Sequence, residues 1–108
     1  MCVHDHQFVA VSNIVGEFEV NGVLGLAPVP GNVSFVQNLF NQGKIENPYV
    51  GLNFEYPEDV DQQSRVNFGW YDYSQAKGGK DGLLWYPNVG IDAWALLVKD
   101  FSYGQIDL

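Results

Sequence analysis

The stretch Val20-Asn21-Gly22-Val23-Leu24-Gly25-Leu26-Ala27-Pro28 is the most informative part of the sequence for the fold. Its second half, Val23 to Leu26, is a short apolar run of the kind that is buried inside a β protein. The following segment, Ala27 to Gly31, contains two prolines, and proline ends a strand because it has no N–H to donate to a sheet. We therefore expect a short buried segment at 23–26 that is entered from a polar Asn21-Gly22 turn.

One helix is predicted, over about Ser34–Gln42. Ser34 and Gln37 have the spacing of a capping box, in which the serine oxygen accepts from the backbone N–H of the glutamine and the glutamine side chain reaches back. Gly43 is placed to end the helix in the left-handed conformation. Apolar residues recur at helical spacing on one face, namely Phe35, Val36, Leu39 and Phe40.

The rest of the chain predicts strands and turns, so the expected fold class is mostly β with this one short helix. Alternation over Tyr49–Tyr56 places Val50, Leu52, Phe54 and Tyr56 on one face and Gly51, Asn53 and Glu55 on the other. Arg65–Trp70 alternates in the same way, after an acidic, solvated connection at 57–64. Further strands are expected at Gln7–Val11, Leu83–Pro87 and Ala93–Phe101, with an exposed loop at Ser74–Gly82 and a turn at Tyr103-Gly104-Gln105.

Composition excludes several classes of partner. The chain has 108 residues, 46% of them hydrophobic, which suits one domain. With 5 Lys and Arg against 13 Asp and Glu, the net charge of −8 would repel nucleic acids and anionic membrane surfaces. Apolar runs are much shorter than the roughly 20 residues of a membrane helix, and the start of the chain lacks the pattern of a signal peptide. Cys2 has no second cysteine in the sequence to pair with.

Six motifs, taken in order, resemble the middle of a pepsin-like aspartic protease. In that family the amino-terminal lobe ends in a phrase of the type Phe-Asp-Gly-Ile-Leu-Gly-Leu, followed by a helix that ends in Gln-Gly, a strand, an acidic hairpin and a Phe-Gly-Gly strand, before strands of the inter-lobe sheet. The matching stretches here are Val20–Leu26, Leu39–Ile45, Tyr49–Tyr56, Arg65–Gly69, Gly82–Tyr86 and Trp94–Val98. Two positions depart from the pattern, because Asn21 replaces the usual aspartate and Trp70 a second glycine.

The resemblance implies that residues 1–108 form a single partial domain, a fragment of a pepsin-like lobe with its inter-lobe sheet. It implies aspartic endopeptidase activity for the whole enzyme, peptide or protein substrates, and a secreted, lysosomal or vacuolar location. By the same resemblance, Phe18, Val20 and Val23 flank the Asn21-Gly22 turn and line the pocket for the side chain before the cleaved bond. A core position is the preferred interpretation of Val23, whereas for Phe18 and Val20 pocket and core are equally good.

The catalytic machinery of this family is not expected within the chain. The mechanism needs two carboxylates that share one proton, each supplied by an Asp-Thr/Ser-Gly turn. The sequence has no such tripeptide and no threonine, so we assign no catalytic residue and expect both aspartates outside residues 1–108. We expect the chain alone to be inactive, to need no cofactor or metal, and to self-associate through exposed strand edges.

Other functional interpretations stay open beside this one. Aromatic residues suggest a non-catalytic β module that binds sugar or peptide, and an inactive protease homologue is a further alternative. These residues are Trp70, Tyr71, Tyr73, Trp85, Tyr86 and Trp94. The pair His4 and His6 lacks an evident third metal ligand, and the acids between Glu55 and Asp61 lack the glycine of a calcium loop, so both are interpreted as solvated surface.

Overall fold

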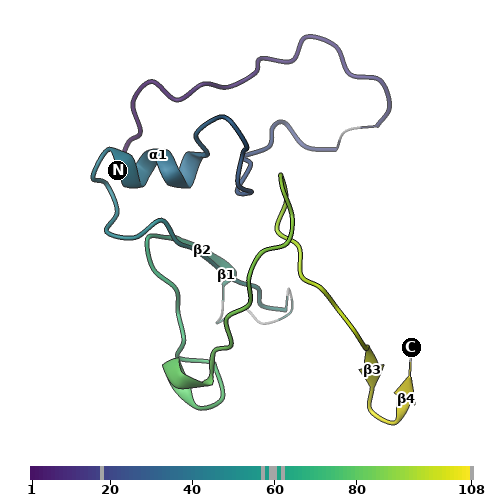
Figure 1. Ribbon diagram of the computed structural model, residues 1–108. Helices are drawn as coiled ribbons and strands as arrows, with labels where there is room; N and C mark the ends of the chain where they lie inside the picture. Colours follow the sequence, from purple (N-terminus) through teal and green to yellow (C-terminus); the bar gives the residue numbers. More distant parts are fainter. Residues whose placement is uncertain (18, 57, 59–60, 62, 108) are drawn as a thin grey trace.

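A computed structural model describes residues 1–17, 19–56, 58, 61 and 63–107 of the chain (Figure 1). Its elements are the helix α1 (Phe35–Asn41), the strands β1 (Val50–Asn53) and β2 (Arg65–Phe68), a 3-10 helix at Gly79–Gly82, and the strands β3 (Ser102–Tyr103) and β4 (Ile106–Asp107). The strands form two separate antiparallel pairs, β1 with β2 and β3 with β4. A short α-helix beside antiparallel strands is therefore confirmed, although the strands are shorter than expected.

Helix α1 forms for the reasons visible in the sequence. The Ser34 hydroxyl accepts from the backbone N–H of Gln37 at 3.2 Å, and Gly43 adopts a left-handed φ of +68° after the last turn. The capping box is only half made, because the Gln37 amide donates to Asn41 at 2.9 Å instead of reaching back. Val36 and Leu39 are buried, whereas Phe40, expected on the same face, is exposed.

The amino-terminal segment lies along α1 and is fixed there by side-chain amides (Figure 1). The Gln42 amide accepts from the backbone N–H of His4 at 2.8 Å and donates to its carbonyl at 2.7 Å. The His6 ring is 3.1 Å from the Asn38 amide nitrogen and contacts the Phe35 ring edge-on. Phe35 in turn contacts Phe68 of β2, with ring centroids 5.6 Å apart, so α1 joins the start of the chain to the sheet.

Strands β1 and β2 pair in the register Val50 with Phe68, Gly51 with Asn67, Leu52 with Val66 and Asn53 with Arg65. After β2, Gly69 reverses the chain with a φ of +90°, a conformation that glycine adopts without strain. A side chain at this position would also meet Ile45, since a Cβ would lie 2.7 Å from the Ile45 Cβ. The reversal brings residues 70–72 back against β1.

Three expected strands, at Gln7–Val11, Leu83–Pro87 and Ala93–Phe101, are absent from the described part of the chain, and these predictions are wrong for the structure. A strand needs a ladder of backbone bonds to a neighbour, and none forms in the described part of these segments. Ala95 accepts from the Val89 backbone N–H at 3.0 Å, but no ladder continues from this bond. Their large apolar side chains are mostly exposed. The radius of gyration is 17.4 Å, compared with about 13 Å for a compact domain of this length.

A hydrogen bond ties Trp94, in the carboxyl-terminal part of the chain, to the segment after the Asn21-Gly22 turn. The indole N–H of Trp94 donates to the carbonyl of Leu26 at 2.9 Å. The loop that carries Trp94 is closed by Asn88, whose side-chain oxygen accepts from the backbone N–H of Gly90 at 3.0 Å and of Ala95 at 2.8 Å. Further on, Gly104 makes the predicted turn, with a φ of +62° between β3 and β4.

Candidate functional site

A groove of about 650 Å³ runs between the amino-terminal segment, the chain around Val23, and the start of α1. Phe8 and Val9 line one wall, Val23 and Leu24 another, and Phe35 of α1 lies at the helix side. The groove is more apolar than polar, and Asp92 is the one carboxylate among the described residues that line it. An apolar side chain of a peptide would fit such a surface better than a charged one.

The three residues predicted to line the substrate pocket do not all lie at one site in the described structure. Val23 lines the groove and is 77% exposed, so its expected burial in the core is wrong. Val20 is 55% exposed and does not line this groove, and Phe18 lies outside the described residues. The expected buried segment at 23–26 is a loop that is exposed at Val23 to Gly25 and half-buried at Leu26, because no strand of the described chain pairs with it.

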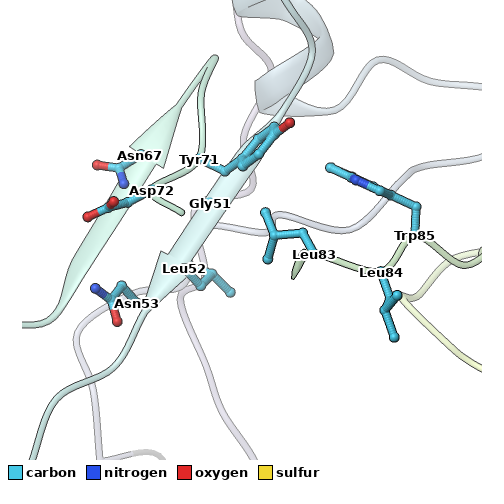
Figure 2. Close-up of a pocket in the computed structure, with 9 residues that line it drawn as sticks. All are labelled: Gly51, Leu52, Asn53, Asn67, Tyr71, Asp72, Leu83, Leu84 and Trp85. Carbon is cyan, nitrogen blue, oxygen red and sulfur yellow. The ribbon is translucent and has the colours of Figure 1, made fainter. Parts of the chain in front are cut away.

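A second cavity, of about 210 Å³, lies between the β1–β2 sheet and residues 83–85 (Figure 2). Polar side chains line one side of this cavity and apolar side chains the other. Asn53, Asn67 and Asp72 gather on the sheet side, whereas the opposite side is formed by Leu83, Leu84 and Trp85. Gly51, Leu52 and Tyr71 lie between the two sides.

The polar face of the β1–β2 pair is the more covered one around Gly51 and Asn67. Gly51 and Asn53 are partly covered and Asn67 is only 9% exposed, whereas Leu52 and Val66 on the apolar face are exposed. The cause is the chain reversal at Gly69, which brings Tyr71 onto Gly51. A Cβ at Gly51 would lie 2.9 Å from the Trp70 carbonyl oxygen, so only glycine allows this close approach.

Asn67 is the residue that the sequence interpretation missed. Within the part of the chain that the structure describes, no group hydrogen-bonds to its side-chain amide, although the residue is nine-tenths buried. None of its polar atoms is sealed from the surface, so the amide faces the cavity it lines. The signal in the sequence was an asparagine on the same face as a glycine of the paired strand, where the missing side chain leaves room for the chain to approach.

Asp72 is an ionised acceptor at the edge of the same cavity. Its carboxylate accepts from the backbone N–H of Ser74 at 2.9 Å. This bond, helped by the Ser74 side chain and by the positive charge of Arg65, lowers the pKa of the Asp72 carboxyl below its usual value of 3.8. A catalytic acid needs a raised pKa instead, so Asp72 suits hydrogen bonding to a ligand better than proton donation.

An aromatic cluster of Tyr49, Tyr71 and Trp85 adjoins the cavity. Ring centroids are 5.2 Å apart between Tyr71 and Trp85, 5.7 Å between Tyr49 and Tyr71, and 6.2 Å between Tyr49 and Trp85. The contact of Tyr71 with Trp85 is nearly perpendicular, at 72°. Rings this close pack against one another, which fixes the position of Trp85. The three rings also line an apolar pocket of about 430 Å³, together with Leu52 and Trp94.

Neither a metal-ligand cluster nor a membrane-spanning helix occurs among the described residues. Among the residues described, no cluster of three or more His, Cys, Asp or Glu side chains is arranged to hold a metal ion. Nor does any described helix have the length and apolar character needed to cross a bilayer. The acidic connection between β1 and β2 falls partly outside the described residues.

Comparisons with known proteins give no relatives for this chain. No protein-family model, no curated protein and no solved structure matches the chain.

Proposed function

We propose that this chain is the scaffold part of a pepsin-like aspartic endopeptidase and supplies part of its substrate pocket. The proposal is supported by the order of the six sequence motifs, from Val20–Leu26 to Trp94–Val98. It is also consistent with the succession of a capped helix and an antiparallel strand pair at the positions that the resemblance implies.

One observation carries the substrate-pocket part of the proposal. Val23, next to the Asn21-Gly22 turn, lines an apolar groove of about 650 Å³ together with Phe8 and Phe35. In the proposed role the groove receives an apolar side chain of the peptide substrate. Val20, which is exposed on the other side of the turn, would contact the neighbouring part of the substrate.

In such an enzyme the chemistry is performed by two aspartates, one that activates water and one that donates a proton to the scissile carbonyl. The chain has no Asp-Thr/Ser-Gly sequence, so the proposal gives it no catalytic residue. Its contribution to rate is positioning, since holding the peptide in register with the two carboxylates lowers the entropy cost of reaction.

Two experiments test the proposal. The transcript that encodes this chain is sequenced in both directions, and Asp-Thr/Ser-Gly coding sequence on each side is expected. The encoded protein is then assayed for cleavage of an unfolded protein at acidic pH, with and without a statine-type inhibitor. Uninterrupted coding sequence that lacks both turns, or an encoded protein that does not cleave, would overturn the assignment.

A further inference from the structure

From the cavity of Figure 2 we infer a site for a neutral pyranose ring, separate from the groove at Val23. A pyranose has hydroxyl groups around its edge and a face made of C–H bonds. It is recognised where side-chain amides and carboxylates stand opposite a flat aromatic surface. The cavity has both kinds of lining on opposite sides, from residues that are far apart in the sequence.

The polar side offers the hydrogen bonds that sugar hydroxyls need. Each hydroxyl is both a donor and an acceptor, and so is each side-chain amide. The amides of Asn53 and Asn67 make no hydrogen bond with the described protein groups, and Asn67 is nine-tenths buried. None of the polar atoms of Asn67 is sealed from the surface, so its amide is able to bond to a ligand that enters the cavity.

Asp72 adds an acceptor to this side. Its carboxylate already accepts one bond, from Ser74, and has lone pairs left for a ligand hydroxyl. A neighbouring cavity of about 210 Å³ shares Asn53 and Asp72 and is lined by polar side chains, including Arg65 and Gln75. The polar side therefore continues past the cavity, which leaves room for a second sugar unit.

The apolar side provides the stacking surface. Trp85 is 68% exposed, yet its ring is held by Tyr71, with centroids 5.2 Å apart. A fixed, exposed indole binds flat apolar faces at a low cost in side-chain entropy. Leu83 and Leu84, the two residues before Trp85, add further apolar surface to the cavity lining.

Size and charge select the kind of ligand. About 210 Å³ is below the roughly 300–1,000 Å³ of sites for drug-sized molecules, so the cavity suits a single ring. The net charge of −8 disfavours phosphorylated or carboxylated sugars. A peptide would instead be recognised mainly by strand pairing along a sheet edge, so the test includes a short peptide as a competing ligand.

The test is a titration of the purified chain with methyl glucopyranoside and methyl galactopyranoside, followed by NMR of the side-chain amides and by tryptophan fluorescence. We expect saturable binding of at least one of them in the millimolar range, with shifts of the Asn53 and Asn67 amide signals. The Trp85→Ala variant should bind at least about tenfold more weakly. Trp70→Ala is the matched control, because Trp70 is also exposed and does not line the cavity.

Two nearly isosteric variants distinguish a loss of binding from a loss of folding. Asn67→Asp and Asp72→Asn change which atoms donate and accept while keeping the side-chain shape, and each should weaken binding with an unchanged circular dichroism spectrum. The methyl glycoside of glucuronic acid should bind more weakly than the neutral sugars. No binding of either neutral sugar at tens of millimolar would overturn the inference. Equal losses in Trp85→Ala and Trp70→Ala, or binding of N-acetyl-trialanine amide at the same amides instead, would also overturn it.

Discussion

Replacement of Leu39 by alanine tests whether the stability of this chain depends on one face of α1. Leu39 is 1% exposed and is the largest fully buried side chain among the described residues. Leucine-to-alanine changes in protein cores cost about 2–5 kcal/mol. Because Val36 and Leu39 are the buried apolar side chains among the described residues, the core is small, and we expect about 2–3 kcal/mol, near the lower limit.

That loss is large for this protein. A chain of this length has at best a free energy of unfolding of about 5–15 kcal/mol, and the extensive apolar exposure places this one near or below the lower value. Urea unfolding followed by far-ultraviolet circular dichroism measures the change. Leu97→Ala is the control, because Leu97 is 77% exposed and its truncation should alter stability by less than about 0.5 kcal/mol. Equal effects of the two substitutions would refute the placement of the core at α1.

Four further predictions follow from single features. Ser34→Ala removes the cap of α1 and should destabilise the helix by about 1 kcal/mol in the same urea assay, and no change would contradict the observed cap. Gly69→Ala places a Cβ at a position with a positive φ and against Ile45, so it should lower the free energy of unfolding by about 1–3 kcal/mol. An unchanged free energy of unfolding would contradict the tight reversal after β2. The pKa of the Asp72 carboxyl is lowered in the folded chain, so its bond to Ser74 stabilises the turn above pH 3.8. This stabilisation is lost as the pH falls through the folded-state pKa. An NMR titration of Asp72 with a midpoint above 3.8 would contradict the lowered pKa. Sedimentation at increasing concentration should show self-association, because apolar side chains and strand edges are exposed, and a monomer at all concentrations would count against that expectation.

Features that depend on a few neighbouring residues were predictable from the sequence. The cap at Ser34, the helix end at Gly43 and the turn at Gly104 are all confirmed, since each is decided by side chains or a glycine within one turn of the chain. The acidic connection at 57–64 joins two alternating segments, and these segments pair as antiparallel strands β1 and β2, as the hairpin of the resembled family implies.

Features that depend on a distant partner were not predictable. Alternation correctly placed Leu52 and Asn53 on opposite faces, but could not tell which face would be covered. The answer depends on the reversal at Gly69, which brings Trp70 and Tyr71 onto the polar face at Gly51. The strand expected at Leu83–Pro87 lies instead beside the sheet as the apolar wall of the cavity, without a backbone ladder.

The proposal that this chain serves a two-aspartate peptidase is tested most directly on the natural protein that contains it. An antibody raised against the purified chain isolates that protein from the cells that produce it, and the isolate is assayed for cleavage of an unfolded protein at acidic pH. The account predicts cleavage that a statine-type inhibitor abolishes. An isolate that does not cleave, or that cleaves equally well with the inhibitor present, would contradict it.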